Sequence, residues 1–262
     1  GDINLLWGTP LADAPSLEGV EGLQLIRPRV PSQAVTWEMD ATSPPFDNVK
    51  ARQALAYAID RDAILQAAYY GQGVVSTTNT ILADNNPAHA SGMQVYSYDL
   101  EKAKALFAEA GITEGTKLTW WGLGGAQPEW QASAEILQAS LKEIGIDLEI
   151  KNSEVAVWVD KFYPAGKSFP NMVVPNYQSV PPEPAFSMNF LLTGRCECNW
   201  DNKEFDGLYE KAVGTVDPVA RNEVWAQAQK LENEQVPLIT PLQVAQVAGA
   251  SSTISGVWME GG

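Results

Sequence analysis

The segment from Pro44 to Gly73 constrains the fold of this 262-residue chain more than any other. Its residues, PPFDNVKARQALAYAIDRDAILQAAYYGQG, open with a proline-rich turn and close with two glycines. Asp47 precedes the apolar run and can accept a hydrogen bond from the free amides of a helix's first turn. The apolar residues that recur near helical spacing define one face: Ala54, Leu55, Ala58, Ile59 and Leu65. The segment predicts one amphipathic helix that Asp47 caps and that Gly71 and Gly73 end.

A second helix and a crossover unit follow. Tyr98–Gly111 has Asp99 as its cap and a glycine at its end. Lys117–Trp121 and Ile146–Ile150 alternate as strands do, and Pro128–Ile144 between them has a helical apolar face. Strand, helix and strand with short joints form a βαβ unit, which joins parallel strands.

The remaining segments complete a predicted α/β fold. Val35–Asp40 alternates as a strand, and residues 74–92 form a long polar connection of the kind that carries function or wraps across a surface. Other predicted elements are helices at Val155–Phe162, Phe205–Val213 and Pro218–Glu234, a strand at Met172–Val174, a proline-rich loop at 175–184, and an apolar stretch at Val236–Val247 that Pro237 and Pro241 interrupt. Near the start, Ile3–Trp7 and Leu23–Ile26 fit pieces of a second sheet.

Composition excludes several classes of protein. The chain has 45% hydrophobic and 19% charged residues, which is typical of a globular protein. Its formal net charge is −15, with 17 Lys and Arg against 32 Asp and Glu, so it cannot build the basic surface that nucleic acid requires. No apolar run approaches the ~20 residues that span a bilayer.

Catalytic and cofactor patterns are also absent from the sequence. His89 is the single histidine, and there is no GxSxG, HExxH or phosphate-binding glycine loop. Gly122–Gly125 is interpreted as a flexible turn. The acid pairs Glu101/Glu109 and Glu232/Glu234 fall on helix faces predicted to be exposed. We therefore expect no enzyme activity, no cofactor and no metal site.

Cys196 and Cys198 form the one unusual pair. An extended backbone would hold two residues at this spacing near the upper limit for a disulfide and point their side chains apart. A metal site would need further ligands, and the only histidine is far away in sequence. A structural or incidental pair is therefore favoured over a metal or redox site.

Two segments together resemble one family. PPFDNVKARQALAYAIDR (44–61) and YDLEKAKALFAEAG (98–111) are similar to the signatures of the peptide/nickel-type (family 5) extracytoplasmic solute-binding proteins of ABC transporters. The resemblance implies an α/β, periplasmic-binding-protein-like fold (type II, cluster C) whose two lobes close on a ligand. Members are much longer, so the resemblance makes this chain a C-terminal fragment. Lobe two would be nearly complete at 35–235, with remnants of lobe one and a crossover at 1–34 and a return strand at 236–262.

The implied ligand site lies beyond the carboxyl ends of parallel strands, where Trp and Tyr give broad contact surfaces with a polar handle. Strand alternation turns only one of two adjacent residues to the core and does not indicate which, so both Trp120 and Trp121 are expected at the site, with Trp121 favoured. The expected ligand-binding residues are Trp37, Asp40, Trp120, Trp121, Gly122, Leu123, Tyr177, Gln178 and Ser179, with Glu38 also bordering the cleft; the expected hinge residues are Val35, Thr36, Val236 and Pro237.

One departure from the family bears on the ligand. In peptide-binding members, the loop matched by residues 177–184 carries an aspartate that pairs with the peptide's amino terminus. Here Val180 takes that position, and no Asp occurs between Asp160 and Asp201. A buried ammonium without a carboxylate partner is strongly penalised. A sugar, an opine-like compound or another polar small molecule is therefore at least as good a candidate as an ordinary peptide.

The function implied by the resemblance is capture of a small polar solute (an oligopeptide, an oligosaccharide or an opine-like compound) between two lobes, and its delivery to ABC permease subunits. The protein would act as a monomer, without nucleic acid, at a periplasmic or extracellular, membrane-anchored location. The alternatives are an enzyme or a redox or metal protein that uses Cys196 and Cys198, and a sensory receptor that presents its ligand to another protein.

Overall fold

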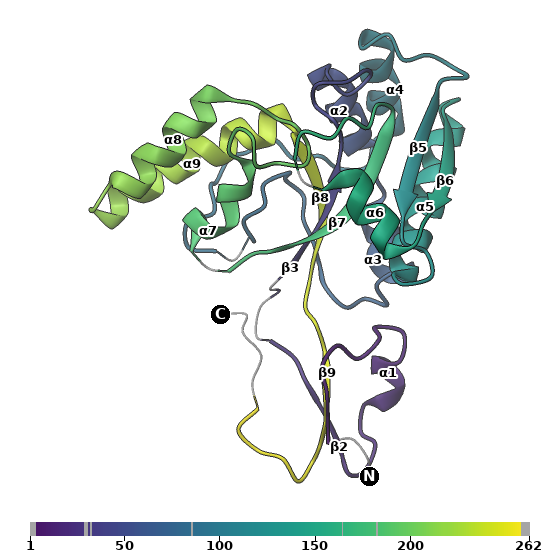
Figure 1. Cartoon of the computed structure of the whole chain (residues 1–262), viewed down its shortest axis with the longest axis vertical. Coiled ribbons are helices and arrows are strands. Elements are labelled where there is room, and N and C mark those ends of the chain that lie inside the picture. The colour runs from purple at the N-terminus through teal and green to yellow at the C-terminus, as the bar shows by residue number, and fades with distance from the viewer. Residues whose placement is uncertain are drawn as a thin grey trace.

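The computed structural model describes residues 4–28, 31, 33–84, 86–163, 165–181 and 183–257. Figure 1 shows a large α/β lobe above a small sheet, with the chain crossing between them twice. The small sheet has the order β1-β9-β2, formed by Leu5–Leu6, Ala248–Ser251 and Leu23–Ile26, and both pairings are antiparallel. A short helix, α1 (Ala14–Leu17), precedes β2. The two apolar stretches at the N-terminal end thus belong to a second sheet, as predicted.

The large lobe is built on a six-stranded mixed sheet with the order β4-β8-β3-β7-β5-β6. In that order the strands are Val74–Val75, Leu238–Val244, Gln33–Glu38, Met172–Ser179, Lys117–Gly122 and Asp147–Asn152. β5 pairs parallel with both β6 and β7, whereas β3 pairs antiparallel with both β7 and β8. The predicted βαβ unit is confirmed, because α5 (Pro128–Glu143) connects β5 to the parallel β6.

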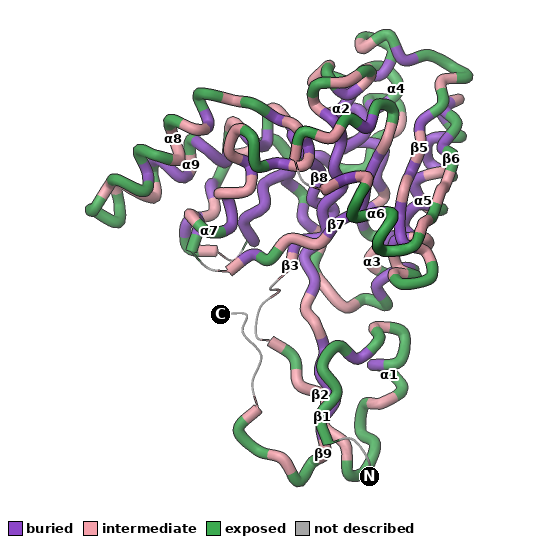
Figure 2. Tube along the Cα trace, in the orientation of Figure 1, coloured by how far each residue is buried: buried purple, intermediate pink, exposed green. Residues whose placement is uncertain are grey.

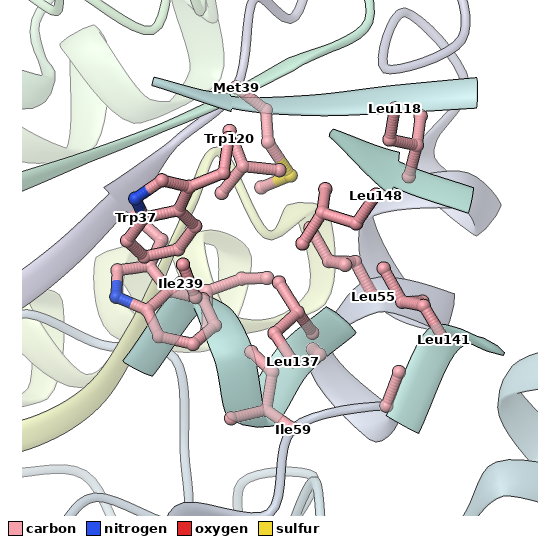
Figure 3. Close-up of a cluster of buried hydrophobic side chains, with 14 of the residues drawn as sticks. Trp37, Met39, Leu55, Ile59, Leu118, Trp120, Leu137, Leu141, Leu148 and Ile239 are labelled. Atoms are coloured by element: carbon pink, nitrogen blue, oxygen red, sulfur yellow. The ribbon is translucent and has the colours of Figure 1, made fainter. Parts of the chain in front are cut away.

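Helices cover both faces of this sheet and create two hydrophobic cores. The first core contains Val35, Trp37 and Met39 of β3, and the second contains Ala34 of the same strand. The other helices are α2 (Val49–Tyr57), α3 (Arg61–Ala67), α4 (Leu100–Glu109), α6 (Val155–Phe162), α7 (Pro184–Met188), α8 (Lys203–Gly214) and α9 (Pro218–Gln235), with a 3₁₀ turn at Asn189–Leu191. Figure 2 shows the resulting buried band through β3, β7 and β8, and Figure 3 shows side chains of the first core.

The first segment singled out in the sequence folds as two helices and not as one. Asn48, and not Asp47, caps α2 by accepting a hydrogen bond from the Lys50 amide (2.9 Å). Asp60 then caps α3 through the Ala63 amide (2.9 Å), which begins a new helix inside the predicted one. The predictions of Asp99 and Asp217 as caps of α4 and α9 are confirmed.

Two strands continue through prolines that the sequence predicted would interrupt them. β7 continues through Pro175 to Ser179, where a loop was expected. β5 pairs with β7 only at Met172 and Val173, so β7 has an open edge beyond them that can accommodate a proline. β8 likewise continues through Pro241, and its pairing with β3 shifts register between Val35 and Trp37.

The crossing between the lobe and the small sheet lies further along the chain than predicted. The expected hinge residues Val35, Thr36, Val236 and Pro237 are all buried within the large lobe. β8 is a central strand of that lobe, with all seven of its residues buried, so the return strand cannot begin at residue 236. Gln33 and Val244 are paired, and Ala245–Val247 then lead to the small sheet. The structure therefore places the boundary at Val244.

The long polar connection after β4 wraps across α9, whose polar side chains hold its backbone. Glu232 Oε1 accepts from the Ile81 amide (2.8 Å), and Gln229 Oε1 accepts from the Ala90 amide (2.9 Å). Glu232 is completely buried, which corrects the prediction that it lies on an exposed helix face. The buried amides of the connection need acceptors, and α9 supplies them.

Candidate functional site

A cavity of about 480 Å³ lies where the chain crosses between the two sheets. Its walls come from Gly8–Ala12, from Val244 and the crossing residues Ala245–Val247, from the end of α3, and from the start of α5 together with Tyr177 at the end of β7. The cavity therefore combines residues of the large lobe with residues on the small-sheet side.

Tyr177 links this cavity to Glu129 and to Tyr69 through part-buried hydrogen bonds. Its hydroxyl donates to Glu129 Oε1 (2.7 Å) and lies 3.3 Å from the hydroxyl of Tyr69. The Tyr177 ring also packs on Trp130, with centroids 5.5 Å apart. Burial, together with the Tyr69 and Glu129 side chains, raises the pKa of Tyr177 well above its usual value. Tyr177 is therefore a protonated donor that fixes the orientation of Glu129.

The opposite face of β7 carries a second polar group of side chains. Asn176 Nδ2 donates to Glu38 Oε1 (3.1 Å), and Gln178 Nε2 lies 3.5 Å from the same oxygen. Glu38 is 2% exposed, and burial, with a further contribution from the Glu197 charge, raises its pKa to about 8. Glu38 is therefore largely uncharged at neutral pH. Ser179, at the end of the strand, is exposed.

The tryptophans divide between core and surface. Trp37 and Trp120 are completely buried and meet edge to face with centroids 4.9 Å apart, so the structure places both in the first core and away from the cavity. Trp121 lies on the other face of β5 and is only partly buried, so one tryptophan of the adjacent pair is in the core and the other is not, as strand alternation predicted. The Trp121 indole Nε1 donates to Ser153 Oγ (3.1 Å), and Lys161 Nζ lies 4.6 Å from its ring centroid. Trp121 does not line the cavity among the described residues.

Gly122 and Leu123 are also buried parts of the framework. A Cβ on Gly122 would lie 2.9 Å from Trp120 Nε1, closer than side-chain carbons are found to packed neighbours. Gly122 thus lets the indole of Trp120 pack against the backbone of β5, and neither Gly122 nor Leu123 lines the cavity.

Asp40 is a structural anchor. It is completely buried, and its carboxylate accepts hydrogen bonds from three segments of chain. The donors are Thr42 N, Thr42 Oγ1, Ser43 Oγ, Ser168 Oγ, Phe169 N and Asn199 Nδ2, at 2.6–3.1 Å. Burial alone would raise the pKa of Asp40, but these hydrogen bonds outweigh it and lower the pKa. Its acceptor capacity is used within the protein, so the expectation that Asp40 contacts a ligand has no support in its surroundings.

Cys196 and Cys198 are bonded as a disulfide, which corrects the expectation that their spacing hinders one. Their Cα atoms are 5.0 Å apart, because the backbone between them is bent and not extended. Both residues are buried, at 2% and 0% exposure, in the second core. Among the described residues, no group of three His, Cys, Asp or Glu is arranged to hold a metal ion.

The disulfide should contribute little to stability, because a loop this short loses little entropy when it is closed. Reducing the disulfide without changing the sequence should lower the free energy of unfolding by about 1–2 kcal/mol. Chemical denaturation measures the difference. A loss above about 4 kcal/mol, or stoichiometric metal in the reduced protein, would contradict this assignment.

Sequence reasoning missed Glu129, Tyr69 and Thr9. Glu129 directly follows the predicted first residue of α5, Pro128, at the amino end of a helix that follows a strand. That position could have identified it, because ligands collect where strand ends meet helix N-termini. Thr9 carries no comparable signal, since its place in the cavity depends on how the small sheet packs.

A lobe that continues through two crossing segments into a second sheet, with a cavity at the crossing, is the architecture of a two-lobed binding protein. The family model for bacterial extracellular solute-binding proteins, family 5 middle region, matches residues 1–196. The chain belongs to this family, and the predicted periplasmic-binding-protein-like fold is confirmed.

Relatives show how much of a longer protein this chain represents. The dipeptide-binding protein of Escherichia coli is 30% identical over 204 residues, which are 74% of this chain and 37% of that protein. Heme-binding protein A of Haemophilus influenzae is 30% identical over 220 residues, or 81% of this chain and 39% of that protein. The dipeptide-binding protein of Pseudoalteromonas sp. SM9913, solved with Met-Leu, is 27% identical with a TM-score of 0.84, over 99% of this chain and 52% of its own. The chain spans about half or less of each.

Proposed function

We propose that this chain is part of an ABC-transporter substrate-binding protein that captures a small polar solute in the cavity at the crossing and delivers it to permease subunits. The position of the cavity carries the proposal. Its walls include the crossing residues Ala245–Val247, so a hinge motion there would open and close the site. Binding would then be coupled to lobe closure without any chemical step.

The proposed solutes include compounds other than peptides. The relatives named above bind, by their names, dipeptides and heme, so family membership does not select one ligand. Val180, at the position expected to hold an aspartate, is 7% exposed and packs in the second core. The candidates are an oligopeptide, an oligosaccharide or an opine-like compound, recognised through Tyr177 and the glutamine side chains of the cavity.

The proposed location follows the family and is periplasmic or extracellular, with the protein held at the membrane beside its permease. In the parts of the chain that the structure describes, no helix is long and apolar enough to cross a membrane. The proposed active form is a monomer.

Thermal unfolding in the presence of a solute panel tests the proposal. A solute at 100 times its Kd stabilises the folded protein by about 2.7 kcal/mol, so a true ligand among dipeptides, oligosaccharides and opines should raise Tm by several degrees. The Tyr177→Ala variant should lose this shift. Val216→Ala, at an 89% exposed position beyond α8, should retain it. If no member of the panel raises Tm, the proposal is wrong.

A further inference from the structure

Glu129 gives the cavity its charge. Among the described residues that line the cavity, Glu129 is the only one with a charged side chain. The remaining lining side chains are apolar or are neutral polar groups such as Gln33, Gln127 and Gln246. A solute carboxylate placed here would meet no cationic partner and would be repelled by Glu129.

The carboxylate of Glu129 has unused hydrogen-bond acceptor positions. Tyr177 occupies Oε1, while Oε2 accepts no hydrogen bond from any residue that the structure describes. No described lysine, arginine or histidine forms an ion pair with this carboxylate. An ionised carboxylate has room for about four hydrogen bonds, so most of its capacity is open.

The helix that carries Glu129 reinforces this arrangement. α5 begins at Pro128, which has no amide hydrogen, and Gln127 makes no side-chain capping bond. The amino end of a helix favours negative charge, and Glu129 in the first turn supplies it from within the protein. A bound anion is therefore not needed to complete this helix end.

Thr9 lines the same cavity from the small-sheet side and is only 4% exposed. Its hydroxyl oxygen is fully covered and lies beside Gly249, where a Cβ would come within 3.2 Å of it. That oxygen is therefore not presented to a solute, and Glu129 is the polar group on which the site depends.

We propose that this cavity receives a cationic group of the solute, an ammonium or a guanidinium, with Glu129 as its ionic partner. This inference rests on the proposed function and names the solute class for the same site. The Tyr177 ring beside Glu129 adds a surface that attracts cations. A volume of about 480 Å³ leaves space for the rest of a small molecule.

Three small probes of matched shape test the charge preference directly: n-butylguanidinium, neutral N-butylurea and anionic pentanoate. Binding is followed by NMR through the indole signal of Trp130, which packs on Tyr177. We expect n-butylguanidinium to bind at least tenfold more tightly than N-butylurea, and pentanoate to bind more weakly still. The preference should fall as salt concentration rises.

The Glu129→Gln variant keeps the size of the side chain and removes its charge. This variant should bind n-butylguanidinium at least tenfold more weakly than the unmodified protein does, and its affinity for N-butylurea should be unchanged. Glu135→Gln makes the same charge change at an exposed position of α5 and should have no effect. Glu129→Ala provides a second variant, expected to weaken the binding of n-butylguanidinium to a similar extent, if Glu129→Gln fails to fold.

Equal binding of n-butylguanidinium and N-butylurea to the unmodified protein would overturn the inference, as would a preference that survives in Glu129→Gln. These results are separable from the proposed function. A neutral or anionic solute that raises Tm while the probes show no charge preference would leave solute capture standing and remove the cationic class.

Discussion

The Asp40→Ala variant should lose about 3–5 kcal/mol of unfolding free energy. Asp40 joins the turn after β3 to residues 168–169 and to Asn199, next to the disulfide. Its removal leaves the buried Phe169 amide without its acceptor and takes a shared acceptor from part-buried donors in all three segments, and an unpaired buried donor is costly. Urea denaturation at neutral pH measures the loss.

A matched control is available on the same side of the lobe. Asp201 is exposed and accepts one longer hydrogen bond, from the Gly194 amide (3.3 Å). Asp201→Ala should change stability by less than about 0.5 kcal/mol. If Asp40→Ala were no more destabilising than this control, Asp40 would not be an anchor, and its predicted contact with a ligand would regain support.

The low pKa of Asp40 adds a pH dependence with a definite sign. A carboxyl whose pKa is lower in the folded protein stabilises it above the usual pKa of 3.8 and loses this contribution as pH falls. Asp40 therefore contributes to unfolding in acid and not in base.

Local sequence patterns predicted most of the elements, because caps and apolar periodicity act over a few residues. Asp99, Pro128 and Asp217 begin their helices as expected. The prediction of one helix failed where two local signals compete, the apolar periodicity and a capping residue. Asp60 lies within a continuous apolar pattern, yet it caps a new helix, and the pattern alone does not indicate which signal prevails.

The site was harder to predict, because its polar residues are defined by distant partners. Asp40 and Glu38 are separated by one residue on the same segment and look equally suited to border a cleft. The donors to Asp40 include groups 128, 129 and 159 residues away in sequence. The partner of Glu38, Asn176, is 138 residues away. Only the assembled sheet shows that Asp40 is a hydrogen-bonded structural anchor, whereas Glu38 is a buried acid with a raised pKa.

Trp37 shows a related limit. Alternation predicts which side of a strand is buried when the other side faces water. β3 is covered on both faces, so five of its six residues, from Ala34 to Glu38, are buried whatever their chemistry. A tryptophan on such a strand carries no sign of a binding surface. On the half-exposed β5, alternation predicts that Trp120 and Trp121 face opposite ways, but only the structure shows which of them is buried.

Stability should fall as pH rises from 5 to 9, with Glu232 as a main cause. Burial raises the pKa of Glu232 to about 8, although hydrogen bonds from Ile81 and Thr80 act in the opposite direction. A carboxyl with a raised pKa carries no penalty below its ordinary pKa of 4.5. The penalty grows as pH rises and is complete above the folded-state value. Glu38, also with a pKa of about 8, adds to the same trend.

Replacing Glu232 by glutamine should remove much of this dependence. The amide oxygen can accept from the Ile81 amide, and the amide nitrogen can donate to Thr80 Oγ1, where Glu232 Oε2 now lies 2.9 Å away. The variant should therefore match the unmodified protein at pH 5 and exceed its unfolding free energy at pH 9 by at least about 2 kcal/mol. Denaturation midpoints across this pH range give the comparison.

Two further variants determine whether burial is the cause. Glu234→Gln removes a charge from an exposed position of the same helix, so its pH profile should follow the unmodified protein. Glu38→Gln combined with Glu232→Gln should give the flattest profile, because both buried carboxyls are then permanently neutral. If Glu232→Gln and Glu234→Gln gave the same slope, general charge repulsion in this acidic chain, and not desolvation of Glu232, would explain the loss of stability in base.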